Sequence, residues 1–410
     1  MQTRLSEDYR NTPAGEEADR ILRSCVHCGF CTATCPTYQL LGDELDGPRG
    51  RIYLLKELLE GNTVSRKTQQ HLDRCLTCRA CETTCPSGVR YARLLDIGRD
   101  VVEKRVQRPF IEGVTRYLLR NVIQHPRRFS LMWRLARWLK PLLPKSLGSK
   151  VPDPQTVLSR PKRRHTRRML VLSGCAQSVV TPNTNAAAAR ILDQLGIELI
   201  ELNSATCCGS VSHHMAASDE AHALMRRLID AWWPYIEQGM EAIVVTASGC
   251  GVTVKDYGDI LKHDHRYAEK AQRVSALTKD LSEVLAKENV SALFGNGKTT
   301  NVAFHSPCTL QHGQKIHGLV ETILRQAGFR LTRVADSHLC CGSAGTYSLL
   351  QPELSRQLLE NKLSALQQEQ ADVIATANIG CQLHMASQAK VPVRHWIELL
   401  SETLNQSDSR

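Results

Sequence analysis

Two runs of cysteine constrain this chain more than any other feature of its sequence. The first run is CVHCGFCTATCP, from Cys25 to Pro36, and the second is CLTCRACETTCP, from Cys75 to Pro86. Both follow the spacing C-x₂-C-x₂-C-x₃-C-P, which ligates [4Fe–4S] clusters in two-cluster ferredoxins. Zinc is the alternative, because C-x₂-C pairs also bind zinc. Eight cysteines in two complete runs of this kind favour iron–sulfur clusters.

The spacing also predicts which cysteines act together. Three thiolates in one tight loop cap three corners of a cubane, and the turn at the following proline carries the fourth thiolate to the other cubane. We therefore expect two crossed ligand sets. They are Cys25, Cys28, Cys31 and Cys85 for cluster 1, and Cys75, Cys78, Cys81 and Cys35 for cluster 2.

The other eight cysteines form an internal repeat. Each copy has a cysteine, then 31 residues, then Cys-Cys-Gly, then a final Gly-Cys. The first copy has Cys175, Cys207, Cys208 and Cys250, and the second has Cys308, Cys340, Cys341 and Cys381. A duplicated four-cysteine set predicts a metal centre in each copy rather than buried free thiols. We expect an iron–sulfur cluster in at least one copy, with zinc as the alternative in the other.

All 16 cysteines fall into these four sets. This argues against disulfides and against a lone nucleophilic cysteine, and we expect no catalytic residue. The N-terminal residues are too polar for a signal peptide, and no apolar run approaches the length of a membrane span. These features favour a cytoplasmic protein, in which clustered thiols bind metal.

Hydrophobic patterning predicts a mixed α and α/β architecture. Apolar residues recur at helical spacing between the two cysteine runs, whereas short apolar strands alternate with helices after residue 166. In each repeat the cysteines follow expected strands, at the sheet edge where open α/β sheets bind ligands. The expected domains are a helical two-cluster ferredoxin-like domain (1–110), a helical basic linker (111–165), Cys-Cys-Gly module 1 (166–296) and Cys-Cys-Gly module 2 (297–410).

The linker carries a basic amphipathic segment from Phe129 to Lys140, and a Lys/Arg run follows at 162–168. With a net charge of +11, the chain favours acidic partners or anionic lipid. The segment fits a lipid interface, as in a protein peripheral to the inner face of the cytoplasmic membrane. Packing against the modules or a partner subunit is the alternative, and the wide apolar arc favours it. With 5% aromatic residues and no base-stacking module, we expect no nucleic-acid binding.

Two histidine positions receive no ligand role. His305 lies three residues before Cys308, but its counterpart in the first repeat is Leu172. We therefore expect a solvated or hydrogen-bonded histidine, with cluster tuning or proton transfer as the alternative. His213 and His214 are expected just past a loop turn, without a function.

Two ferredoxin runs followed by two Cys-Cys-Gly modules resemble the iron–sulfur subunits of flavin-linked hydroxy-acid and glycerol-phosphate dehydrogenases. The modules are similar to those of the heterodisulfide reductase B subunit. Almost the whole chain is most similar to the glycolate oxidase (glycolate dehydrogenase) iron–sulfur subunits. The resemblance rests on CVHCGFCTATCPTYQLLGDELDGPRGRIYLLKELLEGN, CLTCRACETTCPSGVRYARLLDIGRD, HLCCGSAGTYSLL and VRHWIELL.

This resemblance implies an electron-transfer subunit without a substrate site of its own. FAD-containing dehydrogenase subunits would oxidise glycolate to glyoxylate, and a quinone or another acceptor would take the electrons. Equivalent subunits of lactate or glycerol-3-phosphate dehydrogenases, and a heterodisulfide reductase-like thiol–disulfide reductase, are the alternatives. One departure bears on the last alternative, because Ala247 and Asn378 stand where that pattern has a fifth cysteine.

Overall fold

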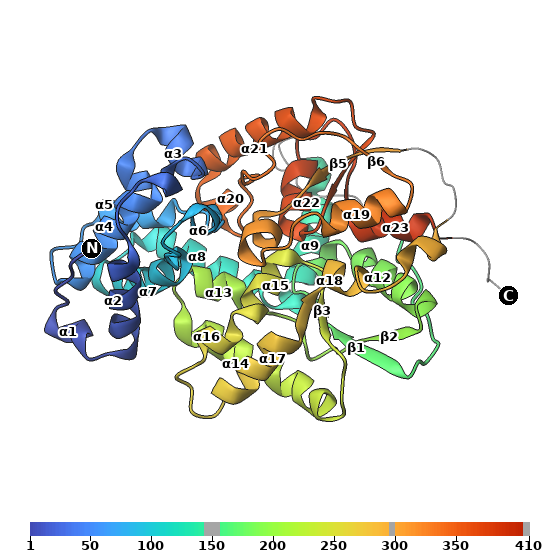
Figure 1. Cartoon of the computed structure of the whole chain (residues 1–410), viewed down its shortest axis with the longest axis horizontal. Helices are drawn as coiled ribbons and strands as arrows, with labels where there is room; N and C mark the ends of the chain where they lie inside the picture. The colour runs from blue at the N-terminus through green and yellow to red at the C-terminus, as the bar shows by residue number, and fades with distance from the viewer. Residues whose placement is uncertain (143–155, 295–299, 405–410) are drawn as a thin grey trace.

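The computed structural model describes residues 1–142, 156–294 and 300–404. A helical N-terminal region lies beside a larger α/β body (Figure 1). This arrangement confirms the expected fold class. The linker residues 143–155 and the expected module boundary at 296–297 lie outside the described residues.

The N-terminal region is helical because its apolar residues face one interior. Leu22, Leu55 and Leu94 come from three different helices and are fully buried in its core. Proline at the first position starts α4, and Gly61 at φ +91° follows its end. The helices are α1 (Glu7–Arg10), α2 (Pro13–Ser24), α3 (Pro36–Leu41), α4 (Pro48–Leu59), α5 (Arg66–Asp73), α6 (Ala80–Thr84) and α7 (Tyr91–Arg105), with 3₁₀ turns η1 (Phe30–Thr32) and η2 (Glu44–Asp46).

Module 1 is a four-stranded parallel sheet in the order β2-β1-β3-β4. Its strands are β1 (Arg167–Val171), β2 (Ile197–Glu201), β3 (Ile243–Val245) and β4 (Thr278–Asp280). The sequence did not indicate β4, which is short and carries one Lys and one Asp. The helices are α11 (Gln177–Val180), α12 (Asn183–Gln194), α13 (Ser210–His214), α14 (Ser218–Glu237), α15 (Ser248–Lys255), α16 (Tyr257–Ile260), α17 (Ala268–Leu277) and α18 (Leu281–Leu285), with the turn η4 (Val290–Leu293).

Module 2 repeats this topology in the order β6-β5-β7-β8. Its strands are β5 (Asn301–His305), β6 (Arg330–Leu331), β7 (Val373–Thr376) and β8 (Val393–His395). The strand β6 is only two residues long. The helical segments are η5 (a π-helix, Thr309–Gly313), α19 (Leu319–Gln326), α20 (Tyr347–Leu350), α21 (Pro352–Gln367), α22 (Ile379–Ala386) and α23 (Trp396–Glu402).

The two modules share one hydrophobic core. Met169 and Ile191 of module 1 belong to the same buried cluster as Phe304 and Trp396 of module 2. His395 Nε2 also lies 2.9 Å from the carbonyl oxygen of Thr246. The shared core fixes the two sheets relative to each other, and with them the sheet edges that carry the cysteines.

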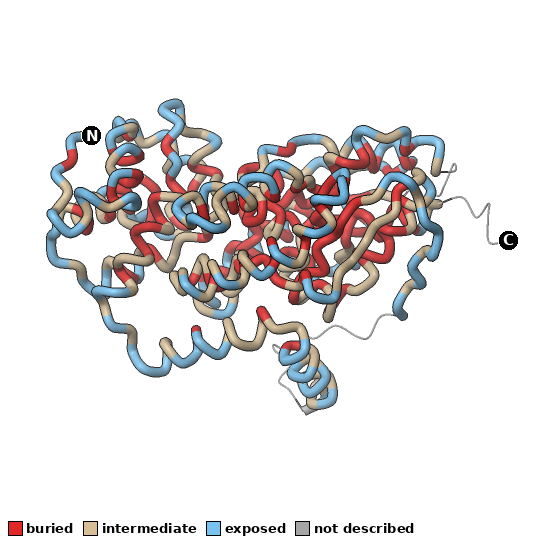
Figure 2. Tube along the Cα trace, turned by 90° about the horizontal axis from the view of Figure 1, so that it is seen from below, coloured by how far each residue is buried: buried red, intermediate tan, exposed pale blue. Residues whose placement is uncertain are grey.

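Two further helices, α8 (Phe110–Ile123) and α9 (Pro126–Leu139), connect the helical region to module 1. The only buried residue of α9 is Phe129, while Leu131, Leu135 and Trp138 are 71%, 52% and 75% exposed. The expectation that this apolar face packs against the modules is therefore wrong for these side chains. In Figure 2 the helix that leads into the grey segment after residue 142 projects from the body of the molecule.

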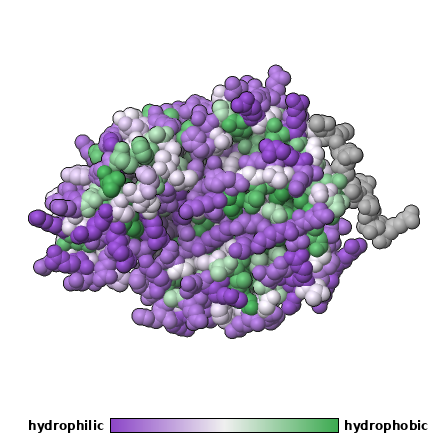
Figure 3. Space-filling view, viewed as in Figure 1, coloured by the Kyte–Doolittle hydropathy of each residue, from purple (hydrophilic) through white to green (hydrophobic). Residues whose placement is uncertain are grey.

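The face seen in Figure 3 is mostly hydrophilic, with hydrophobic side chains in scattered groups. Among the described residues, no helix is long and apolar enough to cross a membrane.

Candidate functional site

The two ferredoxin loops repeat the same backbone conformation. His27 and Thr77 stand before the second cysteine of each loop, with φ of +57° and +54°. Gly29 and Arg79 follow that cysteine, also with positive φ. In the second loop the Thr77 N–H donates to Cys75 Sγ at 3.4 Å. The left-handed residues turn backbone N–H groups toward the sulfurs, which is the environment that stabilises thiolate ligands.

Each predicted crossed ligand set lines its own recess. Cys25, Cys28, Cys31 and Cys85 line one recess, which Cys81 also reaches. Cys35, Cys75, Cys78 and Cys81 line a second recess. In both recesses the fourth cysteine comes from the other loop. The residues present therefore fit two four-thiolate clusters, and the geometry supports the crossed ligand sets.

The two recesses differ in their surroundings. Around the first, Cys28 is exposed, and Val26 and Phe30 are 67% and 61% exposed. Around the second, burial and then the neighbouring Cys308 thiol raise the pKa of Cys78 well above its usual value. The first loop therefore faces solvent and the second faces module 2.

Buried charges beside the second recess were missed in the sequence. Arg51 is 1% exposed, pairs with Asp46, and donates to Thr37 Oγ1 at 3.2 Å. Thr37 Oγ1 in turn lies 3.3 Å from Cys35 Sγ. A buried arginine needs such partners, so Arg51 fixes the position of Cys35 through Thr37. The only signal in the sequence is the GPRGR run, which does not reveal a buried ion pair.

The glycine of each Cys-Cys-Gly motif is required by the backbone. Gly209 and Gly342 have φ of +78° and +85°, a region that side chains with a Cβ rarely adopt. A Cβ on Gly342 would also lie 2.6 Å from the Ser355 carbonyl oxygen. The N–H groups of Gly209 and Gly342 donate to Cys207 Sγ at 3.5 Å and Cys340 Sγ at 3.4 Å. The motif therefore builds a tight turn that directs an amide at a thiolate.

The cysteines of each module meet where the strand order reverses. The segment after the first strand of each module supplies one cysteine, the segment after the second supplies the Cys-Cys pair, and α15 or α22 supplies the last. In an α/β sheet this position, at the carboxyl ends of the two central strands, forms the ligand crevice. The structure thus places the cysteines at the edge expected from the sequence.

The four thiols of each module lie close together. In module 1, Cys175 interacts with Cys207, and Cys208 interacts with Cys250. In module 2, Cys308 Sγ lies 3.9 Å from Cys340 Sγ, and Cys341 interacts with both Cys340 and Cys381. Four buried or half-buried thiols per module are a donor set for soft metal centres. The set fits one metal centre per module.

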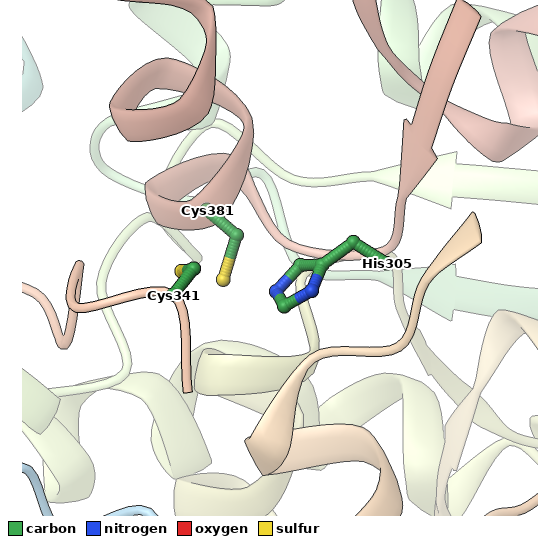
Figure 4. Close-up of side chains that lie close together, drawn as sticks. All are labelled: His305, Cys341 and Cys381. Carbon is green, nitrogen blue, oxygen red and sulfur yellow. The ribbon is translucent and has the colours of Figure 1, made fainter. Parts of the chain in front are cut away.

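His305 joins the cysteines of module 2, as Figure 4 shows. One of its ring nitrogens and the sulfurs of Cys341 and Cys381 all lie within 4.8 Å of one another. The residue is 2% exposed, and its Nε2 has no hydrogen-bond partner among the described residues. Burial, and after it the nearby Lys362, lowers the pKa of His305 well below its usual value. The expectation of a solvated or hydrogen-bonded histidine is wrong for this nitrogen.

His213 and His214 lie at the contact between the ferredoxin region and module 1. They belong to α13 and its end, and His213 Nε2 lies 3.1 Å from Asp96 Oδ2. Burial opposes ionisation of Asp96, but the two histidines hold its pKa well below the usual value. Arg79 and Asp256 form a further ion pair across this boundary. The histidines therefore contribute to the domain contact, which a loop position in the sequence did not indicate.

Comparison with known proteins supports the two kinds of site separately. Residues 21–89 match the family described as 4Fe-4S dicluster domain. Residues 169–255 and 302–386 each match the family described as Cysteine-rich domain. The first match supports two [4Fe–4S] clusters in the N-terminal region, while the residues that hold each cluster stay a prediction.

Two curated relatives match along nearly the whole chain, and a third matches about half of it. The glycolate oxidase iron-sulfur subunit of Escherichia coli (strain K12) is 57% identical over 99% of this chain and 100% of its own length. The probable glycolate oxidase iron-sulfur subunit of Bacillus subtilis (strain 168) is 29% identical over 95% of both chains. Lactate utilization protein A of Bacillus licheniformis is 25% identical over 55% of this chain.

The crossed ligand sets predict the effect of removing Cys35. A Cys35→Ser variant should lose or convert the cluster bound by Cys75, Cys78 and Cys81, because Cys35 lines their recess. Electron paramagnetic resonance of the reduced full-length chain measures this. Cys85→Ser is the matched control and should damage the cluster of Cys25, Cys28 and Cys31 instead. Damage confined to the Cys25 cluster in Cys35→Ser would refute the crossed sets.

Proposed function

This chain belongs to the family of glycolate oxidase iron-sulfur subunits, and from that premise we propose that it is the electron-transfer subunit of a flavin-linked glycolate dehydrogenase. A FAD-containing partner would oxidise glycolate to glyoxylate. The present chain would pass the electrons toward a quinone or another acceptor. The family membership rests on a full-length match at 57% identity.

The main support for the proposal is the order of the cysteine sites, which runs from the protein surface to module 2. One ferredoxin loop reaches the surface at Cys28, and the other places Cys78 against Cys308 of module 2. A bound [4Fe–4S] cluster supplies one-electron storage and transfer. Cys28 and its exposed neighbours Val26 and Phe30 mark the surface that a redox partner would approach. Such an arrangement suits a carrier rather than an enzyme with its own substrate pocket.

The main competing substrate is lactate. Lactate utilization proteins match only 55% of this chain, at 25% identity. The glycolate oxidase subunits match 99% and 95% of it. The extent of the match therefore favours glycolate over lactate.

Reduction by substrate tests this proposal. The tagged full-length chain is isolated from its own host under anaerobic conditions together with the proteins that bind it, and glycolate is added. We expect a co-isolated flavoprotein and bleaching of the iron–sulfur absorbance, because electrons from the flavin reach the clusters. Lactate and glycerol 3-phosphate are the matched comparisons. Bleaching with either of these but not with glycolate, or no flavoprotein at all, would contradict the proposal.

The exposed apolar face of α9 supports a contact with anionic lipid. Leu131, Leu135 and Trp138 project from a helix that also exposes Arg127 and Arg134. Contiguous apolar side chains that face solvent mark interaction sites. An apolar face bordered by arginines is typical of helices that lie in a lipid interface. Each basic residue near an anionic surface adds about 1 kcal/mol of attraction.

Vesicle flotation tests the lipid contact. The full-length chain should float with vesicles containing anionic lipid, and much less with neutral vesicles. Replacing Leu131 and Trp138 together by Glu should reduce flotation several-fold, because both lose apolar burial and gain repulsion. Val157→Glu, at a residue that is 67% exposed outside α9, is the matched control and should float normally. Failure of the unaltered chain to float with anionic vesicles would assign this face to a partner subunit.

A further inference from the structure

His305 occupies the position in module 2 from which a side chain can reach the metal-binding thiols. It is the last residue of β5 and pairs in register with Thr376 of β7. The reversal of strand order falls between these two strands. Its imidazole points toward the sulfurs of Cys341 and Cys381 (Figure 4), and the three ligand atoms lie within 4.8 Å of one another.

The burial of this histidine is unexplained unless it binds something. Its Nε2 is buried and makes no hydrogen bond within the part of the chain that the structure describes. Leaving a buried polar atom without a partner destabilises the folded chain, so such atoms are rare in native proteins. A metal ion bound by the adjacent thiolates would satisfy this nitrogen.

Module 1 provides an internal control. At the position of His305 it has Leu172, which is also buried. The fold therefore accepts an apolar residue at the end of this strand, and packing alone does not require histidine. A second polar residue of module 2, Lys362, is buried near Cys341 and Cys340. The corresponding part of α14 in module 1 has the buried apolar residues Leu228 and Ile229. The polar groups are thus specific to the second site.

We propose that His305 is a ligand of an iron–sulfur centre in module 2, together with the four cysteines of that module. These five donors are Cys308, Cys340, Cys341, Cys381 and His305. A structural zinc ion takes four ligands and would leave one of these donors unused, whereas a centre with several irons accommodates all five. Within residues 156–294, the site of module 1 offers only the four sulfur donors, so the two centres differ in kind.

The charge near the second centre also gives it a distinct role. Because His305 is added to four thiolates and replaces none of them, the neutral imidazole leaves the ligand charge unchanged, and the charges around the centre set its potential. Nearby, Lys362 Nζ donates to the Asp336 carbonyl oxygen at 2.8 Å, which holds the ammonium near these thiols. A positive charge stabilises the reduced, more negative state. We therefore assign module 2 the higher potential of the two modules.

Pulsed electron paramagnetic resonance of the full-length chain tests the ligand. The protein is produced with nitrogen-isotope-labelled histidine and purified anaerobically, and its metals are counted. We expect a histidine-nitrogen coupling at one iron–sulfur centre. The His305→Leu variant carries the residue of module 1, and it should lose this coupling together with roughly two to four irons per chain.

Two further variants make the result specific. His305→Cys should regain the iron but not the nitrogen coupling, which separates ligand loss from misfolding. His317→Leu removes an exposed histidine of the same module and should change neither signal. An unaltered coupling and iron content in His305→Leu would overturn the proposal. Zinc in place of iron in module 2 of the unaltered protein would also overturn it.

Discussion

The arrangement of sites depends on one contact, between the second ferredoxin loop and module 2. Leu76 and Cys78 of the loop belong to the same apolar cluster as Cys308, Cys340 and Tyr347. Burial and the neighbouring Cys308 thiol together raise the pKa of Cys78. The ion pair of Arg79 with Asp256 fastens the same loop to module 1. The loop is thereby held against both modules at once.

This contact matters because both modules present their cysteines at the same edge of their sheets, where the central strands end. Their shared core, which includes Phe304 and Trp396, fixes the edges relative to each other. Asn378 of module 2 accepts the N–H of Gly249 at 3.2 Å and donates to Cys381 Sγ at 3.4 Å. One amide therefore connects the backbone beside Cys250 with a thiol of the second site. Asn378 stands where the related reductase pattern has a fifth cysteine, and here its amide holds the Cys381 thiol by a hydrogen bond.

Local pattern in the sequence predicted the repeat and the strand ends, because cysteine spacing and apolar runs are encoded within short segments. Prediction from the sequence failed where contacts between distant segments determine the surroundings of a side chain. His305 was set aside because Leu172 occupies its repeat position, yet that difference is what distinguishes the two sites. Packing of the apolar face of α9 against the modules was wrong for Leu131, Leu135 and Trp138, because a wheel pattern cannot show whether the folded chain covers a face. Arg51 was missed because its burial depends on Asp46 and Thr37, which only the folded chain brings together.

We infer that the ferredoxin sites and the module 2 site form one continuous series of redox centres. Magnetic coupling between paramagnetic centres falls steeply with their separation, so it shows directly whether neighbouring centres lie close together. Electron paramagnetic resonance during stepwise reduction of the full-length chain should show the signal of the cluster held by Cys75, Cys78 and Cys81 broaden when the centre in module 2 becomes paramagnetic. Independent, unbroadened signals at every stage of reduction would contradict the account.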